Sequence, residues 1–144
     1  MSPDSTNGDA RGGRDAADWQ IAAAARRREQ EAARAQPLID RFVADAKAAG
    51  IAPVELTARP WSGGGRYRTG IKGWYLKRDR SIGIGVDGGF YLLVVAPTRF
   101  GRFRRVALTP TDPPLQVGEG ARDGESGPLS EYLALCLAAG PDFP

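Results

Sequence analysis

Side chains that could carry out chemistry are scarce in this chain of 144 residues. It has no histidine and a single cysteine, Cys136. Without histidine, neither a Ser-His nor a Cys-His catalytic arrangement is available, nor an imidazole-ligated metal site. One cysteine forms no intramolecular disulfide and no thiolate zinc cluster. Cys136 falls on the apolar side of a predicted helix, where a cysteine usually behaves as a small hydrophobic residue. We therefore expect a protein that is not an enzyme.

Two other patterns also suggest ligand sites, and neither has the context that such a site needs. Gly83, Gly85 and Gly88 match the G-x-G-x-x-G spelling, but the dinucleotide motif joins a strand to a helix. Here residues 90–95 form a second strand pattern, so Asp87-Gly88-Gly89 predicts a β-hairpin. The carboxylates near one loop do not have calcium-loop spacing: Asp112, Glu119, Asp123 and Glu125. We predict no cofactor and no metal.

The strongest signal is a basic stretch between Arg59 and Arg105. It contains eleven lysines and arginines against two acidic residues, whereas the whole chain has a net charge of only +3. Aromatic residues alternate with these cations. Lysine and arginine neutralise phosphates, and exposed rings stack on unpaired bases. The stretch predicts a surface that binds nucleic acid or another polyanion, formed by Arg66, Arg68, Lys72, Trp74, Lys77, Arg78, Arg80, Arg102, Arg104 and Arg105.

Plainer interpretations of the same residues remain open. The cations can simply solvate the outer face of a sheet and protect its edges from pairing. Trp74 can cover the bare glycines at Gly83 and Gly85 instead of a ligand. The acidic partner can also be a protein surface rather than RNA or DNA. A second hypothesis is a protein–protein adaptor that uses the N-terminal helix or a sheet edge. The sequence does not determine the oligomeric state.

The N-terminal third of the chain predicts a tail and two helical segments. Residues 1–14 are polar and predict a disordered tail. Residues 15–36, rich in Ala, Arg and Glu, predict a helical extension that Pro37 breaks or kinks. Residues 38–49 predict an amphipathic helix that ends at Gly50. Its apolar face is Leu38, Ile39, Phe42, Val43 and Ala46.

The rest of the chain predicts strands followed by one helix. We expect strands over 54–57, 66–77, 82–86, 90–96 and 100–108, a short edge strand over 115–117, and a last helix between Pro128 and Gly140. Alternation leaves the register of the 82–95 hairpin open, because residues 90–96 are apolar on both faces. The predicted class is α+β. An antiparallel meander of four to five strands is flanked by an N-terminal and a C-terminal helix on one face, in one domain over 37–140 with a tail over 141–144.

The expected location follows from what the sequence lacks. No apolar run follows a basic segment at the start, so we expect no secretory signal. The longest apolar run, 90–97, is far shorter than the roughly 20 residues that a membrane-spanning helix needs. We therefore expect a soluble cytoplasmic protein with no membrane contact. Its richness in Ala, Arg, Gly and Asp suggests a bacterial source.

Overall fold

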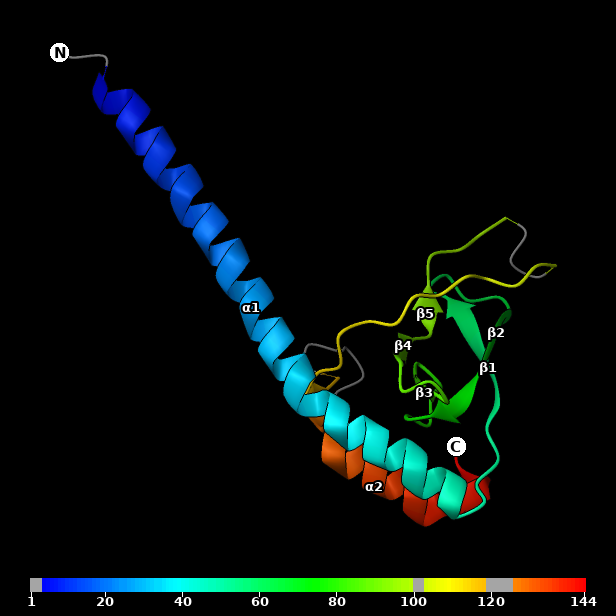
Figure 1. Ribbon diagram of the computed structural model, residues 1–144. Helices are drawn as coiled ribbons and strands as arrows, with labels where there is room; N and C mark the ends of the chain where they lie inside the picture. Colours follow the sequence, from blue (N-terminus) through cyan, green and yellow to red (C-terminus); the bar gives the residue numbers. More distant parts are fainter. Residues whose placement is uncertain (1–3, 100–102, 119–125) are drawn as a thin grey trace.

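The computed structural model describes residues 4–99, 103–118 and 126–144 (Figure 1). A long helix precedes a five-stranded sheet, and a two-stranded ribbon leads into a short helix that lies against the first. This arrangement confirms the predicted α+β class. The elements are α1 (Asp4–Ala48), β1 (Val54–Pro60), β2 (Tyr67–Tyr75), β3 (Ile82–Gly85), β4 (Phe90–Leu92), β5 (Val94–Val95), β6 (Gln116–Val117), β7 (Gly127–Pro128), α2 (Leu129–Ala139) and a 3₁₀ turn (Gly140–Asp142).

Helix α1 is longer than the sequence predicts at its N-terminal end. It begins at Asp4, so residues 4–14 are helical where a disordered tail was expected. It also passes through Pro37, so of the expected break or kink only the break is wrong. Figure 1 shows the helix changing direction within its cyan part, the stretch that contains this proline. Buried Ala35 and Ile39 flank Pro37, and their packing holds the helix together across the missing hydrogen bond.

The C-terminal half of α1 is the part that packs on the rest of the molecule. Its predicted apolar face is buried, apart from Leu38 at its margin. Contact starts before Pro37: Glu31 Oε1 accepts from the Leu115 amide at 2.9 Å, and Gln36 Nε2 donates to the Gly88 carbonyl at 2.8 Å. Gly50 ends the helix with φ 73°, as predicted.

The sheet closes on itself. Its strand order is β4-β3-β2-β1-β5, antiparallel at every pair except β1 with β5, which is parallel. Only Leu93 separates β4 from β5, so one extended segment pairs with both ends of the sheet. The Leu93 amide donates to the Ser81 carbonyl and its carbonyl accepts from the Arg59 amide, both at 2.8 Å. The closure brings β1 next to the turn between β2 and β3.

The two faces of this closed sheet form two apolar cores. The outer core lies between the sheet and the helices and includes Phe42, Trp74, Ile84 and Leu133. The inner core consists of Leu56, Tyr75, Tyr91 and Leu93. Glycines make room for the inner core. A Cβ on Gly83 would lie 2.8 Å from a Leu56 methyl and 3.1 Å from a Leu93 methyl.

The register of the hairpin is settled by its pairing. Ile82 lies opposite Leu92 and Ile84 opposite Phe90, which turns both isoleucines toward the helices. The tight turn has Gly88 at φ 84°, and the Gly85 amide donates to the Gly89 carbonyl at 2.9 Å. The predicted hairpin is confirmed.

The strand expected over 100–108 is wrong where the structure describes it. Residues 103–108 form no strand, and residues 100–102 lie outside the described chain. Closure of the sheet pairs the strand edges that a further strand would need. The segment therefore runs beside β2, held by the Val106 amide donating to the Arg68 carbonyl at 2.8 Å. The last helix begins after Pro128 and ends at Gly140, as predicted.

Candidate functional site

The predicted stacking residue, Trp74, is in the core. Its side chain is 4 % exposed, its indole Nε1 donates to the Ile51 carbonyl at 3.0 Å, and its ring meets Phe42 edge-on at 5.7 Å. Alternation does place Trp74 on the same side of β2 as Arg68 and Lys72. The helices cover only the Trp74 end of that side, so the expectation of an exposed indole is wrong. It does not cover Gly83 either, which faces the inner core.

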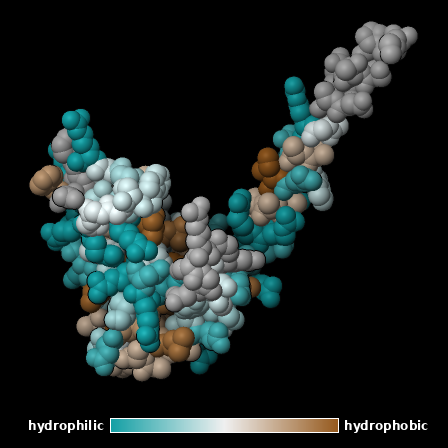
Figure 2. Space-filling model, turned by 180° about the vertical axis from the view of Figure 1, so that it is seen from behind, coloured by the Kyte–Doolittle hydropathy of each residue, from teal (hydrophilic) through white to brown (hydrophobic). Residues whose placement is uncertain are grey.

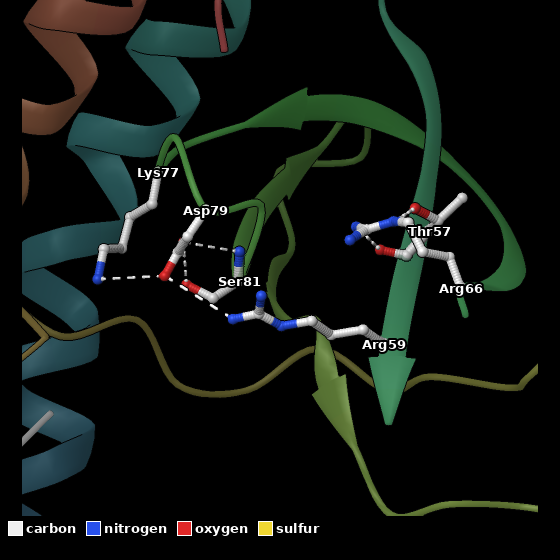
Figure 3. A network of polar contacts seen from close by, with 6 residues as sticks. All are labelled: Thr57, Arg59, Arg66, Lys77, Asp79 and Ser81. Atoms are coloured by element: carbon white, nitrogen blue, oxygen red, sulfur yellow. Dashed lines mark hydrogen bonds and ion pairs between the residues drawn. The ribbon is translucent and has the colours of Figure 1, made fainter. Parts of the chain in front are cut away.

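The predicted cations in the β2–β3 turn differ in exposure. The Lys77 side chain is only 3 % exposed, so its assignment to an open surface is also wrong. Its Nζ lies 3.9 Å from Asp79 Oδ2 (Figure 3). Arg78 and Arg80, in the same turn, are exposed. Arg104 is exposed too, whereas Arg102 lies outside the described residues.

Strand β1 gathers most of the remaining cations. Buried Leu56, Ala58 and Pro60 alternate with partly exposed Glu55, Thr57 and Arg59. Contacts described below link basic side chains from β2, the β2–β3 turn and the segment after β5 to that partly exposed side. We call this set the basic belt; it consists of Arg59, Arg66, Arg68, Lys72, Arg80 and Arg105.

Glu55 is the centre of one end of the belt. Arg68 Nη2 lies 3.1 Å from Glu55 Oε2, and Lys72 sits directly opposite on β2. Arg105 packs against Gly70, where φ is 73° and β2 bulges; a Cβ there would lie 3.2 Å from Arg105 Cδ. The hydrogen bond from Arg68 is the largest influence on the carboxyl. Despite opposing desolvation, the bond and the charges of Arg68 and Arg105 lower the pKa of Glu55.

Thr57 and Tyr75 occupy the middle of the belt. Arg66 donates to the Thr57 hydroxyl and, at 3.1 Å, to its carbonyl (Figure 3). The register shift next to Thr57 accompanies a bond from its amide to the Tyr75 hydroxyl, at 3.0 Å. Arg80 lies over the Tyr75 ring, 5.4 Å from its centroid. Burial would raise the pKa of Tyr75, but hydrogen bonds from Thr57 and Arg66 outweigh it and lower the pKa below 10.0.

Arg59 and Asp79 form the other end. Arg59 Nη2 lies 3.9 Å from Asp79 Oδ2, the same oxygen that faces Lys77. Asp79 Oδ1 accepts from the Ser81 amide at 3.0 Å and its hydroxyl at 2.6 Å, which fixes the carboxylate (Figure 3). Arg59 lies on β1 and Asp79 in the turn between β2 and β3, so this contact depends on closure of the sheet. The belt thus combines six cations with two carboxylates, Glu55 and Asp79, which is a clear positive excess.

An exposed aromatic side chain does lie beside the belt, and it is Trp61. Its side chain is 71 % exposed, and it follows Arg59 by two residues at the end of β1. The Trp61 amide is anchored to the Val95 carbonyl at 3.0 Å. Neither Arg59 nor Trp61 was in the predicted site. The signal was present in the sequence, since Trp61 precedes Gly63-Gly64-Gly65, a run that offers no side chains to bury an indole.

The other chemical candidates show no sign of a reactive site. Cys136 is buried, its Sγ donates to the Tyr75 carbonyl at 3.6 Å, and burial raises its pKa to about 11. Such a thiol is almost entirely protonated at neutral pH. Of the acidic residues near the predicted loop, only Asp112 lies in the described chain. Within that part of the molecule, no group of three or more potential ligands could hold a metal ion.

Comparison of this chain with protein-family models, curated proteins and solved structures found no match. Along the described residues, no helix combines the length and the apolar character needed to cross a membrane. The observations that bear on function are therefore geometric. They are the basic belt, the indole beside it and the course of α1.

Proposed function

We propose that the protein is a non-catalytic binding module whose basic belt contacts a polyanion, with RNA or DNA as the acidic partner. The observation that carries this proposal is a row of cations linked to β1: Arg68 contacts Glu55, Arg66 contacts Thr57 and Arg59 contacts Asp79. A local excess of positive charge attracts phosphates, and their neutralisation releases condensed counterions. The predicted surface is retained in part, since Arg66, Arg68, Lys72, Arg80 and Arg105 belong to the belt.

The ion pairs within the belt leave it available to phosphate. Arg68 keeps 64 % of its side chain exposed while it contacts Glu55. An exposed pair of this kind contributes only about 0–1 kcal/mol, so a phosphate can compete for the guanidinium. The bidentate fork of arginine suits phosphate geometry well. Exchange of a carboxylate for a phosphate is therefore an inexpensive step in binding.

Trp61 favours a single-stranded partner. Its exposed indole stands at the Arg59 end of the belt, where a base can stack while the adjacent phosphates meet the arginines. Duplex DNA keeps its bases stacked on one another, so it gains nothing from this ring. In this proposal Trp61, rather than Trp74, is the side chain that stacks on a base.

The test is a titration of the full chain with a fluorescent single-stranded oligonucleotide between 50 and 200 mM salt. If about four phosphates are contacted, the logarithmic salt slope for a single strand is about −2.8 and affinity falls about fiftyfold over this range. Arg68→Ala and Arg105→Ala should each reduce the magnitude of the slope by about 0.7. Arg41→Ala is the matched control, because Arg41 is an exposed arginine paired with Asp45 on α1. Absence of binding at 50 mM salt, or an equal effect of Arg41→Ala, contradicts the proposal.

A second pair of variants tests the stacking residue. Trp61→Ala should weaken single-strand binding by about 1–3 kcal/mol and leave duplex binding nearly unchanged. Trp19→Ala is a close control, because Trp19 on α1 is 68 % exposed. If Trp61→Ala weakens single-stranded and duplex binding equally, the belt contacts phosphate without base stacking.

Helix α1 supports a second candidate, protein–protein contact through its N-terminal part. Trp19 and Ile21 are exposed there, 68 % and 67 %, on a helix that runs away from the sheet (Figure 1). The sheet-edge version of this hypothesis has less support, because β5 pairs with β1 and β4 with β3. A cytoplasmic location suits both candidates and is part of the proposal.

A further inference from the structure

Two exposed aromatic side chains lie at one end of the sheet. Trp61 follows the end of β1 and is 71 % exposed, and Phe103 is 84 % exposed. Within the described chain, the only other exposed aromatic side chain is Trp19, on the part of α1 that projects from the domain. Phe103 belongs neither to the basic belt nor to the surface predicted from the sequence. A ring with so little contact to its own chain is free to stack on the flat face of a base.

The connections that carry the two rings meet at the same end of the sheet. Strand β1 ends at Pro60 and β2 begins at Tyr67, so Trp61 lies in the connection between them. The segment after β5 passes the same end, because the Thr98 amide donates to the Tyr67 hydroxyl at 3.3 Å. Phe103 follows in that segment. Figure 1 shows both connections at the end of the sheet toward which the β1 arrow points.

The two rings belong to segments on opposite sides of the start of β2. Strand β1 pairs with one edge of β2. At the opposite edge, which β3 occupies only from Gly73 onward, the Arg68 carbonyl accepts from the Val106 amide at 2.8 Å. Phe103 precedes Val106 by three residues, a reach of no more than about 11 Å. Neighbouring strands lie about 4.8 Å apart, so β1 and the segment of Phe103 are separated by about 10 Å across β2.

Cations of the basic belt occupy the space between the two rings. Each ring has an arginine of the belt two residues away, Arg105 beside Phe103 and Arg59 beside Trp61. The start of β2 supplies the others, and Arg68 there keeps 64 % of its side chain exposed. A nucleic-acid strand that crosses β2 therefore meets a ring on each side and guanidinium groups along its phosphates.

The surroundings of the rings are polar. Figure 2 shows this end of the globular part, at the upper left, mostly as teal and pale residues. A partner that inserts apolar side chains or lipid needs a continuous apolar patch. Separate rings among arginines suit an unpaired nucleic-acid strand better, because every base has a face that stacks and every link carries a phosphate.

We infer that Trp61 and Phe103 are two stacking sites for one single strand of RNA or DNA, which crosses the start of β2 with its phosphates on Arg66 and Arg68. This inference rests on the proposed function and adds to it a second ring and a path for the strand. The rings stack on different bases of the same strand, so the losses of affinity on removing each ring multiply. Duplex nucleic acid gains from neither ring, because its bases are already stacked on one another.

The experiment compares two fluorescent strands of equal length on the full chain at 50 mM salt: oligothymidylate and a stable abasic strand with the same phosphates. Phe103→Ala should raise the dissociation constant for oligothymidylate about fivefold or more and leave that for the abasic strand unchanged. Combined with Trp61→Ala, the two fold-changes should multiply. Leu135→Ala is the control, because Leu135 is a 60 % exposed apolar residue on α2. Oligouridylate in the same titration distinguishes RNA from DNA, and tighter binding of either supports the inference.

Two further variants separate stacking from general apolar contact. Phe103→Leu keeps an apolar side chain but removes the flat ring, so it should weaken oligothymidylate binding as Phe103→Ala does. Phe103→Trp keeps a flat ring and should retain the binding. Equal affinity of the leucine and tryptophan variants for oligothymidylate overturns the stacking role.

The remaining outcomes are equally decisive. Unchanged oligothymidylate binding by Phe103→Ala overturns the inference, as does an equal loss on both strands once circular dichroism shows the variant folded. If the wild-type chain binds the abasic strand as tightly as oligothymidylate, the inference fails while the belt proposal stands. If it binds neither strand, the belt proposal fails as well. Vesicles containing phosphatidylserine are titrated in parallel. Lipid binding that Phe103→Ala abolishes, without oligonucleotide binding, assigns the rings to a membrane surface and overturns the inference.

Discussion

The two halves of α1 share one backbone conformation and differ in what stabilises it. Toward the C-terminal end, Ala35, Ile39, Phe42 and Ala46 are buried against the sheet and α2. Toward the N-terminal end, side chains 12–22 are exposed. Most helical stability in proteins comes from packing of an apolar face, and only a modest part from propensity. The docked half is therefore a structural element of the domain, whereas the exposed half depends mainly on helix propensity.

The two halves of α1 also place the same residue types in different surroundings. Ile39 and Ile21 lie on one side of one helix, as do Ala35 and Ala32. The domain ends between them, so only the first of each pair is fully enclosed. Helical periodicity alone cannot report this boundary. Substitutions matched across the boundary test it directly.

The largest contrast is expected for the two isoleucines. Ile39→Ala should lower the free energy of unfolding by about 2–5 kcal/mol, because it leaves a cavity in a fully buried site. Ile21→Ala should change it by less than about 0.5 kcal/mol, because the side chain is exposed. Urea denaturation followed by fluorescence, at a protein concentration where the chain is monomeric, measures both. Similar losses for the two variants would show that the N-terminal half of α1 is packed.

A smaller contrast is expected for two glycines. A Cβ on Gly73 would lie 2.0 Å from the Ile84 carbonyl, so Gly73→Ala should destabilise the sheet by about 1–3 kcal/mol. Gly12 has nothing within 4 Å of its Cβ position, and alanine there should favour the helix by up to about 1 kcal/mol. Thermal unfolding reports the first change. Ellipticity at 222 nm reports the second, and a decrease in helix signal would contradict it.

The smallest effect is expected at Glu55. Its pKa is lowered in the folded chain, so the carboxylate contributes stability above its unfolded value, near 4.5, and the contribution is lost as pH falls through the lower folded value. Glu55→Gln should therefore be slightly less stable than wild type at neutral pH, with the difference shrinking below pH 4.5. It should also tighten oligonucleotide binding, because it removes a carboxylate from the belt. Glu131→Gln, an exposed site on α2, is the control. Weaker binding by Glu55→Gln would argue against phosphate at this end.

Several predictions from local pattern succeeded, although residues 4–14 are helical and α1 passes through Pro37. The apolar face of 38–49, the stop at Gly50, the hairpin at 87–89 and the last helix all depend on neighbours within a few residues. Predictions that depended on distant segments failed. The strand expected over 100–108 did not form, because the closed sheet offered it no free edge. Trp74 lies on the outer side of β2, as alternation predicts, but at the end of β2 that the helices cover.

The sequence by itself determined the α+β class, the basic excess and the lack of histidine chemistry, because composition and short-range periodicity are properties of the chain alone. Only the tertiary structure decided that Trp61 rather than Trp74 is exposed, that Lys77 is buried and that Arg59 joins Arg66, Arg68 and Lys72 along β1. The physical reason is the closure of the sheet through Leu93 and the docking of the helices on one end of β2. Both depend on contacts between residues far apart in the chain, which no local pattern encodes.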